Sequence, residues 1–345
     1  MAVDSSNNND NSRLEKFLVL LKERKEGFVS GQSLARSAGI SRSAVWKYIK
    51  KLCQYGYVVE SLHGQGYRLA GPTESPVPWE LSRMLETSFI GRQGGSIVYR
   101  QSVDSTQSVA IAIAEKQGGD KSSGTVVIAE QQSSGRGRMK RRWVSPRGGL
   151  WLSVILKPEV PTAASTMLPF VAAVAVCDAV RDATGLDATL KWPNDVMIGG
   201  KKVAGILLDL SAEADAINYA VVGIGLNANV DASKIKIERE EGRPPVTSLQ
   251  DELGHAVSRL ALAKLLLEKL ERYCLVLESQ GPEAIVEEWR KRSSMLGLPV
   301  RVMQRGRLQY SGIAADINDD GSLRVRTDDS GGEVAVVSGD VSVVY

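Results

Sequence analysis

Histidine and cysteine are scarce in this chain of 345 residues. His63 and His255 are its only 2 histidines, and its 3 cysteines, Cys53, Cys177 and Cys274, stand far apart in no CxxC or Cys/His cluster. So few histidines disfavour a Ser-His-Asp triad or a His-rich metal site, and lone cysteines disfavour a zinc site or a disulfide framework. We therefore expect a protein of the reducing cytoplasm without a metal centre of its own.

Long apolar runs are lacking too. The longest, MLPFVAAVAVC at 167–177, is too short to span a bilayer and contains Pro169, so we predict a buried helix there and no membrane partner. Residues 1–12 are polar and rich in asparagine, without the apolar core of a signal peptide. We predict that they form a disordered tail.

Charge of one sign is not in excess over the whole chain, whose net charge is only +3. Its distribution is uneven, because residues 1–70 hold 11 Lys and Arg against 6 Asp and Glu, a net of +5 that leaves −2 for the remainder. A basic front end on a near-neutral body indicates nucleic-acid binding at one end only. The length suits two or three domains.

The basic front end has the pattern of a helix-turn-helix. Residues 13–25 carry one apolar helix face, Ser30 can cap a second helix that stops at Gly39, and Ser41 can cap a third that stops at Gly56. The following residues, 57–71, read as two strands around a turn at 63–66, which is a hairpin wing.

This order predicts a winged helix-turn-helix DNA-binding domain over residues 13–70. A small helical domain with a solvated basic face is the alternative. The residues expected to contact DNA lie on the outer faces of the third helix: Ser41, Arg42, Ser43, Trp46, Lys47 and Lys50. Three prolines in GPTESPVPW then predict a linker at 71–80.

A second basic segment, SSGRGRMKRRW at 133–143, raises a separate question. It could be a solvated charge run, an Arg-Gly tract that contacts nucleic acid, or a loop that closes over phosphates. Predicted strands at 124–132 and 148–156 bound it, which favours the last, because glycine allows close backbone approach and arginine binds phosphate or carboxylate bidentately. It is not a Walker A loop.

Three further segments carry candidate ligand contacts. Lys191 in LKWPNDV ends a strand before a rigid proline turn, where it is well placed as a point charge on a ligand, although it could be an ordinary surface lysine. Gly205 in KKVAGILLDL permits close backbone approach. AVVGIGLNANV meets G-x-G-x-x-A, but the strand continues and no helix opens, so we reject a dinucleotide fingerprint. Asn227 could read an adenine edge or simply form a turn.

The rest of the chain has mixed patterns. Helices are expected from about Ser105 and at 165–184, 257–278 and 282–293. From residue 296 onward apolar and polar residues alternate, with a hairpin-turn signal in NDDGS. We predict a small β-barrel at 296–345.

Together, DST at 104–106, Q-x-x-GRGR at 132–138, KWPND at 191–195, and K-x-AGIL with GIGLN at 202–227 resemble the biotin protein ligases. The winged helix-turn-helix resembles the bifunctional subgroup that also represses biotin operons. The resemblance implies an α+β multidomain fold, with a central α/β catalytic domain at 81–295. That domain would have the mixed sheet of the biotin/lipoate ligases and class II synthetases, followed by an SH3-like C-terminal β-barrel.

The resemblance also implies a two-step reaction. Biotin and ATP, with Mg²⁺, would form biotinoyl-5′-AMP, and a lysine of a biotin carboxyl carrier protein would then accept the biotinoyl group. Such chemistry needs a dense positive clamp and no covalent enzyme nucleophile, which agrees with the shortage of His and Cys. The adenylate would also promote a homodimer that binds operator DNA as a transcriptional repressor.

Site residues follow from the matched positions. Lys191, Arg136 and Arg138 are expected to be catalytic. The expected biotin contacts are Ser105, Thr106, Gln107, Gln132, Arg136, Gly137, Arg138, Lys191, Gly205 and Ile206. The expected ATP contacts are Arg136, Arg138, Arg141, Trp143, Lys191 and Asn227. No residues are expected to form a protein metal site.

The chain departs from the family pattern at Gln107, often Asn, at Lys140, often Gly, and at Asp209, commonly Glu. Two alternative functions stay open. The first is a ligand-sensing transcription factor without ligase activity, which the presence of Lys191 and the GRGR arginines disfavours. The second is a lipoate or octanoate ligase, which GRGR together with KWPND disfavours.

Overall fold

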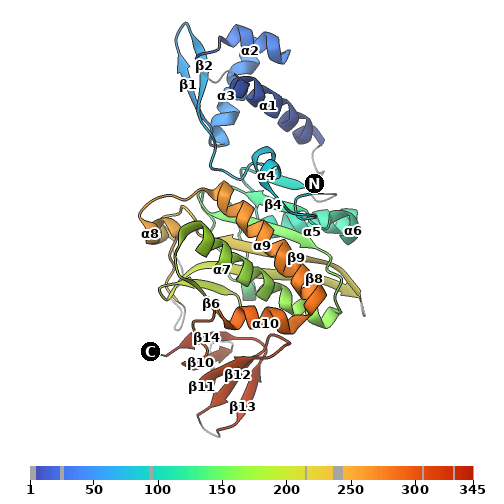
Figure 1. Ribbon diagram of the computed structural model, residues 1–345, viewed down its shortest axis with the longest axis vertical. Helices are drawn as coiled ribbons and strands as arrows, with labels where there is room; N and C mark the ends of the chain where they lie inside the picture. The colour runs from blue at the N-terminus through green and yellow to red at the C-terminus, as the bar shows by residue number, and fades with distance from the viewer. Residues whose placement is uncertain are drawn as a thin grey trace. The chain divides into compact units, whose positions relative to one another are not determined.

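The computed structural model describes residues 5–23, 27–92, 96–213, 216–235, 244–304, 307–328 and 331–344. The chain forms two compact units, Met1–Glu80 and Leu81–Tyr345. Figure 1 shows their helices and strands in chain order. Helix α4 (Pro78–Met84) carries the chain from the first unit into the second.

The first unit contains α1 (Ser5–Glu23), α2 (Gly31–Ala38), α3 (Arg42–Gln54) and an antiparallel hairpin of β1 (Val58–Leu62) and β2 (Gly66–Gly71). Both predicted N-caps are confirmed, since Ser30 Oγ accepts the Ser33 amide at 3.1 Å and Ser41 Oγ accepts the Ala44 amide at 3.2 Å. Gly39 ends α2 in the left-handed conformation, at φ 64°. The helices bury their apolar faces, including Leu14, Phe17, Leu18, Leu21, Val45, Ile49 and Leu52.

The predicted disordered tail is wrong from Ser5 onward, because α1 already begins there; residues 1–4 lie outside the described residues. The composition of residues 1–12 gave no apolar face on which to found a helix. Extending an existing helix by one residue costs much less free energy than nucleating a new helix. A polar segment can therefore extend α1 from its amphipathic part, which packs against the core.

The segment predicted as a linker, 71–80, packs within the first unit, which ends at Glu80. Thr73 Oγ1 donates to the Tyr55 carbonyl at 2.6 Å, and Trp79 Nε1 donates to the Tyr57 hydroxyl at 2.6 Å. The Trp79 ring also meets Tyr55 edge-on, with centroids 5.2 Å apart. Prolines end secondary structure without preventing a neighbouring aromatic side chain such as Trp79 from being buried.

The second unit is built on a seven-stranded mixed sheet of order β3-β4-β5-β9-β8-β7-β6. Only β3 and β4 are parallel neighbours. The strands are β3 (Ile97–Arg100), β4 (Val126–Ala129), β5 (Leu150–Leu156), β6 (Ala188–Lys191), β7 (Asp195–Ile198), β8 (Lys201–Glu213) and β9 (Ala216–Leu226).

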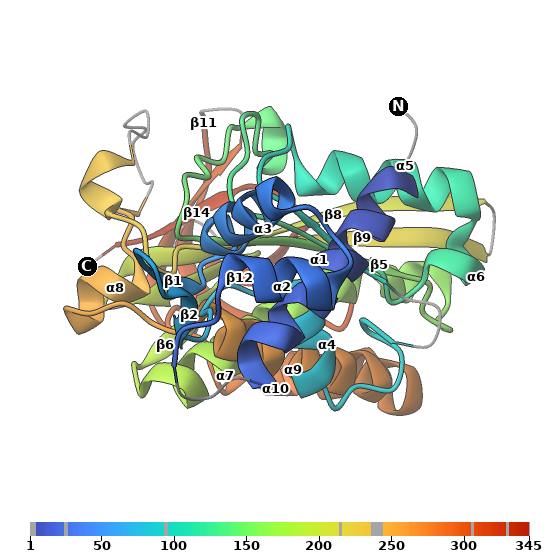
Figure 2. The same cartoon turned by 90° about the horizontal axis from the view of Figure 1, so that it is seen from above.

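Helices cover both faces of this sheet (Figure 2). One face carries α5 (Thr106–Gln117) and α6 (Gly119–Ser122), and the other carries α7 (Leu168–Thr184), α9 (Arg259–Gln280) and α10 (Pro282–Arg290). A short helix, α8 (Leu249–Leu253), follows β9. Residues 162–184 are long and apolar enough to cross a membrane, but most of their surface is buried in the protein. The predicted buried helix is therefore confirmed.

A five-stranded antiparallel sheet ends the second unit, in the order β13-β12-β11-β10-β14. Its strands are β10 (Pro299–Gln304), β11 (Arg307–Ile317), β12 (Leu323–Thr327), β13 (Glu333–Val336) and β14 (Asp340–Val343). The predicted all-β C-terminal region is confirmed at this level.

Strand alternation explains where the sheet is hollow. Val221 packs beneath α5, so Gly223 and Gly225 lie on the same face of β9, and Gly205 pairs with Gly225 across to β8. Val222 and Ile224 point to the opposite face. Three glycines thus leave a patch without side chains beside α5, and β9 runs on to Leu226 as predicted, which excludes the dinucleotide fingerprint.

Candidate active site

A cavity of about 620 Å³ opens over this glycine patch. Every residue predicted to contact biotin or ATP lines it: Ser105, Thr106, Gln107, Gln132, Arg136, Gly137, Arg138, Arg141, Trp143, Lys191, Gly205, Ile206 and Asn227. These residues come from segments far apart in the sequence, and the fold brings them all together.

One end of the cavity is a chain of buried polar side chains. Gln107 Nε2 donates to the Val221 carbonyl at 2.8 Å, and its Oε1 accepts the Ser153 hydroxyl at 2.9 Å. The Ser153 and Thr106 hydroxyls lie 2.9 Å apart, and Gln132 Oε1 accepts the Thr106 amide at 2.8 Å. Adding a Cβ at Gly223 would bring it 2.4 Å from Gln107 Oε1, so the longer glutamine side chain occupies the space that this glycine leaves.

Ser105 stands at the N-cap of α5 and is buried, but its side chain makes no capping hydrogen bond. Together these hydroxyl and amide groups offer donors and acceptors to the polar head of a ligand.

The basic loop forms a narrow hairpin over the cavity. The Trp143 amide donates to the Gly135 carbonyl and the Gly137 amide to the Arg141 carbonyl, both at 2.8 Å. At its tip Met139 and Lys140 have φ values of 54° and 61°. That left-handed region favours glycine, so Lys140, one of the departures from the family pattern, carries backbone strain.

Two loop arginines tie the loop to the body of the unit. Arg141 forms a bidentate ion pair with Asp340 of β14, with Nη1 to Oδ1 at 2.8 Å and Nη2 to Oδ2 at 2.5 Å. Arg138 Nη1 donates to Asn194 Oδ1 at 3.0 Å. Burial lowers the pKa of the Arg138 guanidinium, and the nearby Asp195 and Asp340 oppose that shift.

Arg136 is held more loosely, since its nearest carboxylate is Asp209 at 3.4 Å and its side chain is 44% exposed. Because of its long ion pair and exposure, we expect this arginine to be the one most easily redirected toward a ligand anion.

Lys191 differs from these arginines because it has no counter-ion in contact. It ends β6 and is only 9% exposed, yet among the described residues its ammonium makes no hydrogen bond and no ion pair within 4.0 Å. The nearest carboxylate that raises its pKa, Asp195, is itself paired with Lys202 at 2.5 Å. Burial lowers the pKa of Lys191 overall. A buried cation without a partner is costly, and a ligand anion beside it would remove that cost.

Two polar atoms on the cavity wall are fully buried without a hydrogen-bond partner among the described residues: Asn227 Oδ1 and Trp143 Nε1. Asn227 Nδ2 donates to the Thr247 carbonyl at 3.0 Å, which leaves its oxygen as a free acceptor. The Trp143 indole rests on the glycine patch, since a Cβ added at Gly225 would lie 2.5 Å from Nε1. The Lys202 ammonium lies 5.2 Å from the indole centroid.

Several residues of this cavity are not among the predicted contacts, and four of them make the polar contacts described here or lie beside them: Ser153, Asn194, Lys202 and Asp340. Ser153 is a lone hydroxyl within an apolar strand, which is a usable signal for a buried polar contact. Asn194 and Lys202 lie within the KWPND and K-x-AGIL motifs, but the motifs alone assign no contact to either side chain. Asp340 lies 199 residues from its partner Arg141, and no local pattern relates the two.

The predicted DNA-contacting residues share one exposed face of α3 in the first unit. Ser41, Arg42, Ser43, Trp46, Lys47 and Lys50 are all exposed, whereas Val45, Ile49 and Leu52 face the core. Trp46 is 57% exposed, and the Lys50 ammonium lies 5.2 Å from its ring centroid. An exposed tryptophan flanked by lysines has no packing role in this unit.

The described ranges contain no candidate metal site. Within them, no group of three or more His, Cys, Asp or Glu side chains is arranged to hold a metal ion.

Comparisons with known proteins assign the class. Residues 99–227 match the biotin/lipoate A/B protein ligase family, residues 13–68 an HTH domain, and residues 295–344 the biotin protein ligase C-terminal domain. Most of the cavity lining and nearly all of the seven-stranded sheet lie within the ligase match, so the second unit has the fold of a protein ligase of this class.

Full-length relatives narrow the assignment. The chain is 33% identical over 320 residues to the bifunctional ligase/repressor BirA of Bacillus subtilis (strain 168), covering 92% of this chain and 95% of the relative. It is 29% identical over 335 residues to the protein of the same name from Escherichia coli (strain K12), covering 95% and 98%. The chain belongs to this family of bifunctional biotin ligases and repressors.

Among solved structures, a biotin protein ligase from Aquifex aeolicus in complex with biotin and ATP superposes with a TM-score of 0.58. It is 27% identical and covers 72% of this chain and 98% of its own.

Proposed function

We propose that the chain is an ATP-dependent biotin protein ligase that also represses transcription in response to biotin. The observation that carries the ligase half is the largely buried Lys191 side chain, without an ion-pair partner among the described residues, in a cavity that Arg136, Arg138 and Arg141 also line. A reaction between two anions needs such a centre, and the family relationship supplies the identity of the anions.

In the first step, a carboxylate oxygen of biotin bonds to the α-phosphorus of ATP, and the bond to the leaving pyrophosphate breaks. Carboxylate and triphosphate repel one another, so a cation fixed between them lowers the barrier by stabilising the charge that develops. We assign that role to Lys191. Arg136 and Arg138 add charge at the phosphates, and Arg141 can do so once it leaves Asp340.

In the second step, the amine of a lysine on a biotin carboxyl carrier protein attacks the acyl carbon of biotinoyl-5′-AMP, and AMP leaves. The lysine proton passes to solvent and no enzyme nucleophile takes part. The loop must shield the adenylate from water until the carrier arrives, because the mixed anhydride hydrolyses readily.

We assign the polar end of the cavity, with Ser105, Thr106, Gln107 and Gln132, to the head group of biotin. Gly137, Gly205 and Ile206 would approach the ligand alongside. The unpartnered Asn227 oxygen suits the exocyclic amine of adenine, which is a donor, and Trp143 offers a flat surface to the base.

Magnesium fits this site as a companion of ATP, not as a resident of the protein. The cavity carboxylates Asp195 and Asp340 are engaged by Lys202 and Arg141, and no three-ligand cluster occurs among the described residues. Mg²⁺ commonly binds through substrate phosphates and one or two carboxylates, and it would neutralise part of the phosphate charge here.

Pyrophosphate release tests the ligase half. The full chain is given ATP and Mg²⁺ with biotin, lipoate or octanoate offered separately. Release with biotin alone is the expected result. Release with lipoate or octanoate instead would support the acyl-ligase alternative, and no release with any acid would leave a ligand sensor that has lost its chemistry.

For the repressor half, we propose that the exposed face of α3 enters the major groove and that the β1–β2 hairpin acts as the wing. The adenylate would promote a homodimer whose two α3 helices read two half-sites. Selection of bound sequences from random DNA, with and without biotin plus ATP, tests this. Enrichment of a paired site only with both ligands supports it, and ligand-independent or absent enrichment contradicts it. Light scattering under the same conditions checks the dimer.

Two finer features belong to the same proposal. We describe the C-terminal sheet as an SH3-like barrel that helps to close the ATP end of the cavity, supported by the position of Asp340 on the cavity wall. We place the protein in the cytoplasm, supported by 3 free cysteines with Cys177 and Cys274 buried. Burial raises the pKa of the Cys177 thiol to about 12, so it stays unreactive at neutral pH.

A further inference from the structure

The strand that presents Lys191 is an edge strand. β6 stands last in the seven-stranded sheet, and in the described part of the chain β7 is its only strand neighbour there. It is 4 residues long, with Lys191 as the final one. Short edge strands have few hydrogen bonds to hold them, so the lysine would be poorly fixed if β7 were the only support.

Residues 292–295, which follow α10, cover the open side of β6. The Leu190 amide donates to the Arg292 carbonyl at 2.8 Å, and the Ser294 amide donates to the Leu190 carbonyl at 3.0 Å. On the other side of Lys191, the Trp192 amide donates to Met295 Sδ at 3.1 Å. The backbone on both sides of Lys191 is therefore bound to this one segment, which we call the splint.

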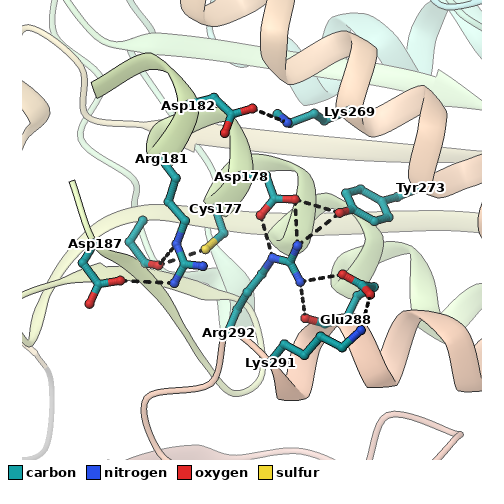
Figure 3. A network of polar contacts seen from close by, with 11 residues as sticks. Cys177, Asp178, Arg181, Asp182, Asp187, Lys269, Tyr273, Glu288, Lys291 and Arg292 are labelled. Atoms are coloured by element: carbon teal, nitrogen blue, oxygen red, sulfur yellow. Dashed lines mark hydrogen bonds and ion pairs between the residues drawn. The ribbon is translucent and has the colours of Figure 1, made fainter. Parts of the chain in front are cut away.

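Arg292 anchors the splint to three helices (Figure 3). Its Nε and Nη2 donate to the two oxygens of Asp178 on α7, at 2.6 and 2.8 Å. Nη2 also donates to the Tyr273 hydroxyl on α9 at 3.2 Å, and Nη1 donates to the Glu288 carbonyl and carboxylate on α10, at 2.6 and 2.8 Å. The Arg292 side chain is only 12% exposed.

The same cluster holds the beginning of β6. The Ala188 carbonyl accepts Arg181 Nε at 2.8 Å and lies 3.1 Å from Cys177 Sγ, and both of those residues neighbour Asp178 on α7 (Figure 3). The strand is thus fixed at its first residue by α7 and at its third by the splint. Its fourth residue is Lys191.

We propose that Arg292 is a positioning residue for Lys191: by anchoring the splint, it fixes the ammonium between the two reacting anions. This rests on the ligase function proposed above. A lysine in place of Arg292 could not satisfy Asp178, Tyr273 and Glu288 together, because it lacks the planar fork of donors. Displacing a reacting group by about 1 Å costs on the order of 100-fold in rate.

The test compares R292K with D182N as a matched control. Asp182 also joins α7 to α9, through Lys269 at 2.6 Å, but within the described ranges it forms no hydrogen bond or ion pair with β6 or the splint. For R292K we expect the kcat of pyrophosphate release to fall about 10- to 100-fold, with the KM for biotin changed by less than about twofold. D182N should keep wild-type kcat. Amide hydrogen exchange at Leu190 and Trp192 should accelerate in R292K alone.

Y273F guards against simple misfolding of R292K, because it removes only the two hydrogen bonds of the Tyr273 hydroxyl, to Asp178 and from Arg292, and keeps the Arg292–Asp178 pair. It should lower kcat in the same direction by a smaller factor. The proposal is overturned if kcat of R292K follows only the folded fraction, or if D182N loses kcat equally. The hydrogen-exchange experiment does not depend on activity. Slow exchange of the Leu190 amide in R292K would therefore refute the role of Arg292 in holding the splint, even if the wild-type enzyme turned out to activate a carboxylic acid other than biotin.

Discussion

Replacing Lys191 by methionine should make the enzyme inactive and the protein more stable. The side chain is 9% exposed and has no ion-pair partner among the described residues, so its charge opposes folding at neutral pH. Methionine keeps the apolar stem and removes the charge. We expect pyrophosphate release to fall by about 100- to 1,000-fold, the usual loss when one electrostatic group is removed from an active site. The free energy of unfolding should rise by about 0.5–2 kcal/mol.

The stability difference between K191M and the wild type should depend on pH. Burial lowers the pKa of Lys191 from its ordinary 10.5, so the unfolded chain binds more protons than the folded one at this group. The wild type therefore gains stability as pH rises through that window, and the advantage of K191M shrinks and disappears above it. Urea unfolding at neutral and alkaline pH measures the difference.

The control is K201M. Lys201 is 41% exposed, pairs with Glu252 and does not line the cavity, so its loss should change neither pyrophosphate release nor stability by much. A K191M protein that is less stable than wild type at neutral pH would refute the assignment of an unpaired buried charge. Undiminished pyrophosphate release would refute its role in the reaction.

Three further changes test other parts of the structure. Asp340→Asn should weaken the hold of β14 on Arg141, and because this pair is half exposed and worth about 0.2–1 kcal/mol, ATP binding by calorimetry should tighten by up to about fivefold. Weaker binding would mean that Asp340 positions Arg141 instead of competing for it. Lys140→Gly should relieve the left-handed strain and raise the free energy of unfolding by about 1 kcal/mol, and a loss of stability in urea would contradict that. Lys47→Gln should reduce the salt slope of DNA binding by about 1 while leaving pyrophosphate release unchanged, and an unaltered slope would remove Lys47 from the interface.

Local signals predicted much of the secondary structure. The serines that cap α2 and α3 are recognisable because only a few side chains can accept the orphan amides of a first helical turn. Apolar spacing located α7, α9 and α10 for the same reason, since one face of each must be buried. Composition failed at 5–12, where propagation of a helix decides the structure, and it gave no sign that Trp79 would be buried.

The candidate site was predictable where its residues sit in short motifs with ligand-binding chemistry, as for Lys191 and the GRGR arginines. Contacts between distant segments were not. The Arg141–Asp340 pair and the Arg292 anchor depend on tertiary packing that no period or cap encodes. Ser153 was partly predictable. A single hydroxyl in an otherwise apolar strand indicates a buried polar contact, but the sequence does not identify Thr106 and Gln107 as its partners.

Trp143 gives the cavity an optical signal of its own. Its indole lies on the glycine patch beside the Lys202 ammonium, and indole emission is sensitive to neighbouring charge and to contact with water. Trp151 and Trp289 are fully buried and do not line the cavity, whereas the buried Trp192 lines it and would add to the signal. A molecule that enters the floor of the cavity must move the Trp143 ring or stack on it. The fluorescence of the unlabelled protein therefore follows closure of the loop in real time, separately from any product formed.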